Sequence, residues 1–288
     1  MKWTVLVDNR TNDSGLGTEH GLSILLETTN EREQCEACIN IAERGGVRRS
    51  QTERYKILLD TGASDVFIRN AELLGIDLSD VDYVFISHGH SDHAGGLRYF
   101  MEINKTAKVI VSPEAISGKY FSKRGNLHSI TAEWPVIPDD RLIMVSESCK
   151  IDNSLQVIAR IPQTNPIPKA NQNLFVQDAN GHHIHDDFRH ELLLYVDGLL
   201  FTGCAHSGLE NILAACPFPV SEVVGGFHLL DGQESEEELL ALAHRLKSHF
   251  PQTRFFTSHC TGDSVFMTLQ SVMDEQIHAF SCGTTINV

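Results

Sequence analysis

The sequence contains no apolar run approaching the roughly 18 residues that a membrane-spanning helix requires, so no membrane partner is expected. Its N-terminus, Met1–Asp8, becomes acidic too soon for a signal peptide and predicts a first strand instead. The seven cysteines are an odd number and lack the spacing of a disulfide framework, which favours free thiols. Together these absences predict a cytoplasmic protein.

Basic residues are scarce in this chain. The 23 Lys and Arg residues stand against 38 Asp and Glu residues, a formal net charge of −15. Such a chain repels polyanions, so we expect no nucleic-acid surface and a small-molecule partner instead. The apolar fraction of 41% is ordinary for a globular protein with a real core. No feature of the sequence specifies an oligomeric state.

Alternating strand and helix patterns run along the whole chain and predict one α/β domain, residues 1–288, without a repeat or a linker. Strands are expected at 3–7, 22–27, 55–59, 83–86, 108–111, 192–196, 199–202, 222–224, 254–257 and 284–287. Helices are expected at 70–74, 96–103, 209–215, 234–249 and 264–273. The stretch 113–168 mixes short strands with prolines and carries little chemistry.

The segment 28–54 is dense in charged residues and longer than a tight hairpin turn needs. We therefore expect it to be an insertion at a hairpin. It contains Cys35 and Cys38, whose spacing is typical of half a zinc site or of a redox pair. Since no second cysteine pair lies nearby, two plain thiols are favoured.

Metal-ligand side chains follow directly on the buried strand predicted at 83–86. His88, His90, Asp92 and His93 are the imidazoles and the carboxylate that hold zinc, manganese or iron in proteins. Two histidines two positions apart in extended backbone point the same way, so His88 and His90 can grip one ion. The following turn redirects Asp92 and His93 toward a second ion.

The motif His-x-His-x-Asp-His after a buried strand, preceded by Leu59-Asp60-Thr61-Gly62, resembles that of the metallo-β-lactamase superfamily. More narrowly, the chain resembles the family of the 7,8-dihydropterin-6-yl-methyl-4-(β-D-ribofuranosyl)aminobenzene 5′-phosphate synthases. The matching segments run nearly end to end, at 19–23, 87–97, 202–211, 225–229 and 258–262.

The resemblance implies an α/β fold, a four-layer αββα sandwich with two divalent transition-metal ions at the edge of its two sheets. It also implies two further ligands. His206 is expected beside the histidine pair of the motif, and His259 beside Asp92 and His93. Zinc is the favoured metal, with manganese or iron as alternatives.

One position departs from the pattern of the superfamily. Many members have Thr-Gly-Asp, with the aspartate bridging the metals, where this chain has Thr202-Gly203-Cys204. Cys204 either fills that role as a thiolate, which favours zinc, or stands aside and leaves the ions bridged by water. Metal identity and occupancy depend on which of the two holds.

The metals imply a hydrolytic mechanism. Two ions about 3.5–4 Å apart lower the pKa of a bridging water to near neutral, and the resulting hydroxide attacks a phosphorus or carbonyl centre. Asp92 is expected to orient that hydroxide as well as to bind metal. His228 is a candidate proton donor to the leaving group, because imidazole titrates near neutral pH. The alternative is a histidine packed in a Gly-Gly-Phe-His turn.

Several residues are expected around this centre without touching the reacting atoms. The resemblance places Glu19 and His20 in an outer shell or in the substrate wall, and Asp60 is expected to be a structural hydrogen-bonding partner. Ser207 and Gly208 begin a helix whose free N–H groups are expected to face the metals and bind an anion, unless they form only a helix start. The histidine-rich stretch 182–190 is interpreted as a solvated loop rather than the mouth of the site.

Three functions fit these expectations. The first is a hydrolase of a phosphoester, in particular a phosphodiesterase acting on a small phosphate-bearing metabolite. The second is a pterin-forming synthase, a transferase that joins a dihydropterin diphosphate to an aminobenzene ribofuranosyl phosphate. The third is a metal-containing module that senses a ligand without turnover. The complete metal motif argues against the third function, and we expect the first.

Replacing both histidines of the motif, His88→Ala plus His90→Ala, is expected to abolish bound metal and activity together, because both side chains hold the same ion. Elemental analysis of the purified protein measures the metal. Active wild-type protein without metal contradicts the prediction.

Overall fold

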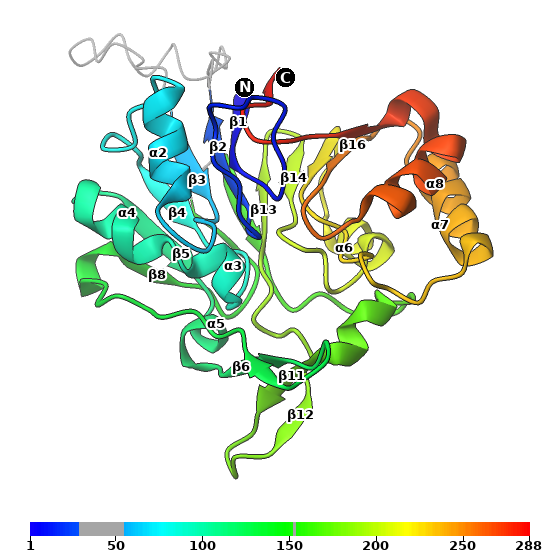
Figure 1. Cartoon of the computed structure of the whole chain (residues 1–288), viewed down its shortest axis with the longest axis horizontal. Helices are drawn as coiled ribbons and strands as arrows, with labels where there is room; N and C mark the ends of the chain where they lie inside the picture. The colour runs from blue at the N-terminus through cyan, green and yellow to red at the C-terminus, as the bar shows by residue number, and fades with distance from the viewer. Residues whose placement is uncertain (29–54, 152–153) are drawn as a thin grey trace, which may run out of the picture.

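The computed structural model describes residues 1–28, 55–151 and 154–288. Within these ranges two large sheets face one another, and helices lie on their outer sides (Figure 1). None of the helices described is long and apolar enough to cross a membrane. In spatial order, the first sheet consists of β18 (Thr285–Asn287), β1 (Lys2–Val7), β2 (Ser23–Glu27), β3 (Lys56–Leu59), β4 (Tyr83–Phe85), β5 (Lys108–Val111) and β8 (Leu142–Met144).

The second large sheet comes mainly from the other half of the chain. It consists of β17 (Ile277–Ala279), β16 (Arg254–Thr257), β15 (Glu222–Val224), β14 (Leu199–Phe201), β13 (Leu193–Val196), β10 (Leu155–Ile158) and β9 (Cys149–Lys150). A third, smaller sheet crosses the lower end of the molecule in Figure 1. Its strands are β12 (His183–His185), β11 (Leu174–Gln177), β6 (Tyr120–Ser122) and β7 (His128–Ser129).

Three hydrophobic cores separate the four layers. The central core lies between the two large sheets and contains Trp3 and Phe201. A second core packs the first sheet against its helices around Phe67 and Phe100, and a third packs the second sheet against its helices around Leu246 and Phe255. The helices are α2 (Val66–Leu73), α3 (Ser91–Ala94), α4 (Leu97–Ile103), α5 (Pro113–Ser117), α6 (Leu209–Ala215), α7 (Glu236–His249) and α8 (Asp263–Met273), with 3₁₀ turns at Asp139–Arg141, Lys169–Asn173 and Asp274–Gln276.

The predicted strands and helices all occur, with small shifts at their ends. The largest difference is α2, which begins at Val66 rather than at residue 70. Its first turn is Val-Phe-Ile, and β-branched and aromatic residues have low intrinsic helix propensity. Burial of Phe67 in the core overrides that preference. A second correction concerns the stretch 182–190, since His183–His185 forms the edge strand β12 instead of a loop.

The predicted insertion follows strand β2. Glu27 pairs with Lys56 across the antiparallel β2–β3 ladder, and the Thr28 amide donates to the Tyr55 carbonyl at 2.8 Å. The chain therefore leaves and re-enters the sheet at neighbouring points, as in a hairpin. Residues 29–54, including Cys35 and Cys38, lie outside the described residues, and the single domain stays a prediction.

The strand directions gather several loops at one edge of the sandwich. Strands β3, β4, β5 and β8 pair in parallel, as do β14, β15, β16 and β17. The carboxyl ends of parallel strands meet at the same edge, where α/β proteins bind ligands. The loops that follow β3, β4, β14, β15 and β16 therefore converge, and these loops carry the motifs of the sequence.

Glycine allows the segment after the His-x-His-x-Asp-His motif to approach the β3 loop closely. A Cβ atom added at Gly96 would lie 2.1 Å from the Thr61 carbonyl oxygen and 2.6 Å from that of Ser64. The Gly96 amide also donates to the Gly62 carbonyl at 3.1 Å. Only a residue without a side chain fits between these backbones.

Gly96→Ala is expected to destabilise the protein by about 1–3 kcal/mol or more, because the added methyl group must displace backbone atoms. Gly15→Ala is the matched control, since its Cβ would meet only a flexible Asp13 side-chain oxygen at 3.3 Å. Thermal unfolding followed by circular dichroism measures both variants. Equal melting temperatures for the two variants would refute the packing argument.

Candidate metal centre

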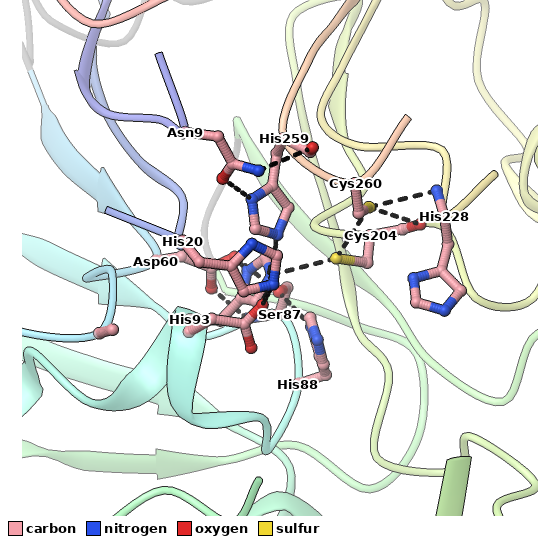
Figure 2. A network of polar contacts seen from close by, with 12 residues as sticks. Asn9, His20, Asp60, Ser87, His88, His93, Cys204, His228, His259 and Cys260 are labelled. Carbon is pink, nitrogen blue, oxygen red and sulfur yellow. Dashed lines mark hydrogen bonds and ion pairs between the residues drawn. The ribbon is translucent and has the colours of Figure 1, made fainter. Parts of the chain in front are cut away.

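The converging loops bring all the predicted metal ligands together. His88, His90 and His206 place their ligand nitrogens within 4.8 Å of one another, and so do the ligand atoms of His20, Asp92 and His259. His93 lies between the two groups, with its Nε2 atom 3.2 Å from that of His259. Figure 2 shows His20, His93 and His259 converging with the two cysteines Cys204 and Cys260.

The Nε2 atoms of His88, His90 and His206 are buried and have no hydrogen-bond partner among the described residues. Burying a polar atom without a partner costs free energy, and native structures leave few such atoms without a water or an ion. Three of them facing one point are what a bound cation requires. The residues present therefore fit a metal ion.

Asp60 sets the protonation of two of the histidines. Its carboxylate accepts from the Ser87 amide and hydroxyl, both at 2.7 Å, and from His93 Nδ1 at 2.6 Å. Since the Ser87 hydroxyl donates to Asp60, its oxygen accepts from His88 Nδ1 at 2.8 Å. Both imidazoles then carry their hydrogen on Nδ1 and present a free lone pair on Nε2.

Two asparagines fix the ring orientation of His206 and His259 in a similar way. Asn171 donates to the His206 carbonyl at 2.8 Å and accepts from His206 Nδ1 at 3.1 Å. Asn9 donates to the His259 carbonyl and accepts from His259 Nδ1 at 3.1 and 3.0 Å. Each asparagine holds both the backbone and the ring of its histidine, so the Nε2 atoms of these residues also face the centre.

Burial keeps the first group of histidines neutral. Desolvation, and then the neighbouring imidazoles, hold the pKa of His88 and of His206 well below the usual value of 6.5. Desolvation likewise lowers the pKa of His90 to about 3. A neutral imidazole is the form that binds metal, so these side chains are ready to do so at neutral pH.

Asp92 forms the centre of the second group. Its Oδ2 atom lies 3.3 Å from His20 Nε2, 3.4 Å from His259 Nε2 and 3.8 Å from His93 Nε2. Burial by itself would raise the pKa of Asp92, but these imidazoles outweigh it and hold the pKa well below 3.8. Burial would lower the pKa of His259, whereas the hydrogen bond to Asp92 and the nearby Cys260 raise it to about 9. Asp92 is therefore an anion placed among nitrogen ligands.

Two cysteine sulfurs lie next to these histidines. Cys204 Sγ is 3.1 Å from His93 Nε2 and 3.2 Å from Cys260 Sγ. Cys204 shares ligand-forming groups with His88 and His93, and with His206 and His228. Cys204 Sγ therefore lies within ligand distance of histidines of both groups, and whether it bridges two ions stays a prediction. Burial raises the pKa of the Cys204 thiol, so a cation is needed to hold it as thiolate.

His228 lies beside this centre and is buried. Neither of its ring nitrogens has a hydrogen-bond partner among the described residues, and its ring centroid is 4.2 Å from that of His206. Its backbone amide donates to Cys260 Sγ at 3.2 Å. The side chain is thus aimed at the centre by a loop tied to Cys260, rather than held by hydrogen bonds within its turn.

The ligand groups open into a cavity of about 230 Å³. His90, Asp92, His206 and His228 are among its lining residues. A second cavity of about 220 Å³ lies against α6 and α7, but it contains none of the ligand groups. The first cavity is therefore the one in which a small molecule can reach a bound ion.

The anion site expected at Ser207 and Gly208 stays a prediction, but the amides just before the helix already have a partner within the protein. The amides of His206 and Ser207 donate to the buried carboxylate of Glu191 at 2.6 and 2.9 Å. These N–H groups are already satisfied by an internal anion. The sequence contains no local signal for this contact, because Glu191 precedes β13 and reaches the loop only in the folded chain.

Glu19 and His20 lie near the centre but differ in position. Glu19 accepts from the Ala63 and Ser64 amides at 2.8 and 3.2 Å and holds the loop after β3. It is not among the residues that line the cavity, whereas His20 is. His20 also stacks on His259, with ring centroids 5.0 Å apart.

His190 corrects the interpretation of the histidine-rich stretch. Its side chain is 2% exposed, so it is part of the interior rather than of a solvated loop. Its Nδ1 atom accepts from the Gly89 amide at 3.0 Å, and its Nε2 atom lies 3.0 Å from Asp186 Oδ2. With both nitrogens used, His190 has no lone pair for a metal and instead fixes the backbone between His88 and His90.

Sequence reasoning missed several residues that shape this centre: Asp8, Asn9, Ser87, Asn171, His190, Glu191 and Cys260. Ser87 was adjacent to the motif, and Cys260 to His259, so their positions carried some signal. The others are ordinary polar residues far away in the chain.

A sandwich that gathers histidines, a carboxylate and thiols at the carboxyl ends of its strands defines a metal-binding protein of the metallo-β-lactamase class. Residues 47–249 match the metallo-β-lactamase superfamily, and the chain belongs to it. Both the resemblance and the αββα fold expected from the sequence are thereby confirmed. Members of the superfamily are metal-dependent, which agrees with the ligand groups described above.

Three relatives resemble the chain along most of its length. The crystal structure of a metal-dependent hydrolase of the beta-lactamase superfamily is 27% identical, has a TM-score of 0.76, and the match covers 100% of this chain and 99% of the other. An uncharacterized protein of Methanocaldococcus jannaschii is 27% identical over 90% of both chains. A 7,8-dihydropterin-6-methyl-4-(beta-D-ribofuranosyl)-aminobenzene-5'-phosphate synthase of the same organism is 25% identical over 96% of this chain and 94% of the relative.

The place of Cys204 between the ligand groups predicts a sulfur–metal bond. Cobalt(II) substituted into the protein is expected to show a near-ultraviolet sulfur-to-metal charge-transfer band, which Cys204→Ser removes. Cys149→Ser is the matched control, because Cys149 is an exposed free thiol. Absorption spectroscopy measures the band, and an undiminished band in Cys204→Ser would show that this sulfur stands aside.

Proposed function

We propose that the protein is a metal-dependent hydrolase of a phosphoester, specifically of a phosphodiester in a small metabolite. The observation that carries the proposal is the set of unpartnered Nε2 atoms of His88, His90 and His206 beside an open cavity. A purely structural ion is enclosed by four protein ligands, whereas a catalytic ion keeps a position open toward its substrate.

We assign two ion positions to the centre. His88, His90 and His206 would hold one ion, and Asp92, His93 and His259 the other, with Cys204 between them. When bound, such ions supply a water of lowered pKa and stabilise negative charge on the reacting group. The thiol of Cys204 favours zinc over manganese or iron.

The chain's own residues have two further tasks in this proposal. Asp92 lies in the cavity wall with its carboxylate ionised, so it can orient a water by accepting its hydrogen. His228 is the proton donor to the leaving group, because its two unpartnered nitrogens leave it free to hold a proton near the cavity.

A phosphoester is favoured over a carbonyl substrate by one relative. The Methanocaldococcus jannaschii synthase is named for a product that carries a 5'-phosphate, and its similarity spans 96% of this chain. The same similarity supports the second candidate function, a synthase that joins a dihydropterin diphosphate to an aminobenzene ribofuranosyl phosphate. The metal-dependent hydrolase with a TM-score of 0.76 supports hydrolysis as the first choice.

Purified protein supplied with zinc, manganese or iron is expected to hydrolyse bis-p-nitrophenyl phosphate. Asp92→Asn should lower kcat by roughly 10²–10³-fold with an unchanged circular dichroism spectrum, because asparagine keeps the shape but loses the charge. The matched control is Asp65→Asn at an exposed carboxylate of the α2 N-cap. Release of p-nitrophenolate measures turnover.

The outcome separates the candidate functions. Condensation of the two pterin-pathway substrates without phosphodiester hydrolysis would favour the synthase. Turnover of a lactone or thioester, with no phosphoester cleaved under any metal, would move the assignment to carbonyl chemistry. Full activity in Asp92→Asn would remove that residue from the mechanism.

A further inference from the structure

The hairpin of β6 and β7 differs in charge from the rest of the chain. Residues 119–130 contain Lys119, Lys123, Arg124 and His128 but no Asp or Glu, whereas the whole chain has a formal charge of −15. The hairpin belongs to the small sheet that crosses the lower end of the molecule in Figure 1. It is therefore a locally positive segment of an acidic protein.

This hairpin forms one wall of the cavity at the metal centre. Ser122, Arg124 and His128 line the cavity together with candidate ligand residues such as Asp92 and His206. Among the described residues that line it, Arg124 is the only Lys or Arg. The cavity is thus lined both by candidate metal ligands and by a single guanidinium group.

Arg124 is exposed and has no partner. It makes no hydrogen bond or ion pair with any described residue. Each of the other eight arginines in the described ranges holds a carboxylate or a carbonyl, as Arg245 holds Glu210 and Arg254 holds Glu222. Within the described ranges of this carboxylate-rich chain, one arginine is left unpaired, and that arginine lines the cavity.

We propose that Arg124 binds a second anionic group of the substrate, a phosphate or a carboxylate remote from the bond that is cleaved. The inference rests on the proposed function, because it takes the metal centre as the place where the first phosphate binds. The substrate is then a small metabolite with two anionic groups joined by a short spacer. A guanidinium suits this task, since it forms two parallel N–H···O bonds with a phosphate or carboxylate.

Recognition by Arg124 would offset the repulsion between the acidic protein and an anionic substrate. The acidic surface repels a doubly anionic molecule, but that repulsion is screened over roughly 8–10 Å at physiological salt. Inside the cavity, an arginine without a competing carboxylate partner acts at contact distance. The hairpin therefore provides selectivity for substrates that carry a charge at both ends.

Matched ligands test the proposal without requiring turnover. Calorimetric titration of the zinc-loaded protein compares n-butyl phosphate with butane-1,4-diol bisphosphate and with 4-carboxybutyl phosphate, and then the same pairs with shorter and longer spacers. At the best spacer length, the second anionic group is expected to strengthen binding at least about tenfold. The bisphosphate and carboxylate arms show which anion Arg124 prefers.

The variants separate recognition by Arg124 from a general charge effect. Arg124→Gln should lose the gain in affinity, and Arg124→Lys should keep part of it, because an ammonium has the charge without the bidentate geometry. Lys105→Gln, at an exposed lysine that does not line the cavity, should keep the whole gain. Equal affinity of ligands with one and with two anionic groups at every spacer length would overturn the inference. A full gain in affinity in Arg124→Gln would overturn it as well. If n-butyl phosphate does not bind to a protein that hydrolyses bis-p-nitrophenyl phosphate, the metal centre does not hold the first phosphate and this inference fails while the proposed function stands. If neither binding nor hydrolysis is found, the proposed function fails as well.

Discussion

The metal centre depends on the hydrogen bonds that the carboxylate of Asp60 accepts. Within 2.7 Å it accepts three hydrogen bonds, from the Ser87 amide, the Ser87 hydroxyl and His93 Nδ1. These bonds join the end of β3 to the loop after β4 and to α3. Because Ser87 passes the constraint on to His88, one buried anion sets the orientation and the tautomer of two histidines. A buried carboxylate is stable here only because its oxygens are satisfied by donors.

Two other buried carboxylates repeat this arrangement in the second half of the chain. Asp8 accepts from the His259 amide and the Ser258 hydroxyl, and Glu191 accepts from the His206 and Ser207 amides. Both loops contain residues with positive φ, 49° at His259 and 53° at Ala205. Such backbone costs on the order of 1 kcal/mol for each residue and persists only where the surroundings fix it. The two buried carboxyl groups supply that fixation through their hydrogen bonds to the ligand loops.

The two ring nitrogens of the candidate ligand histidines thus have different roles: one is hydrogen-bonded within the protein, and the other is turned toward the metal centre. In four histidines the Nδ1 atom is bonded to Asp60, Ser87, Asn171 or Asn9, while the Nε2 atom faces the centre. His190 shows the opposite arrangement, with both nitrogens used and no ligand role. Burial and hydrogen bonding together decide which histidines present a free nitrogen to a metal ion. The binding free energy of an ion that binds only the assembled site would add to the stability of the fold.

The sequence by itself predicted the strand ends that carry His88, His90, Asp92 and His93, because these residues lie within a few positions of one another and strand periodicity is local. The αββα class and the further expected ligands His206 and His259 followed from the resemblance to a known family and not from periodicity. Only the tertiary structure decided what surrounds them. Glu191 occupies the helix start at Ser207, His190 is buried, Cys260 touches Cys204, and Arg124 lines the cavity. These contacts join residues that are far apart in the chain. In the sequence, nothing distinguishes their polar side chains from those of ordinary loop residues. Their roles follow from which loops the parallel strands bring to one edge, and this long-range packing is not encoded in any short motif.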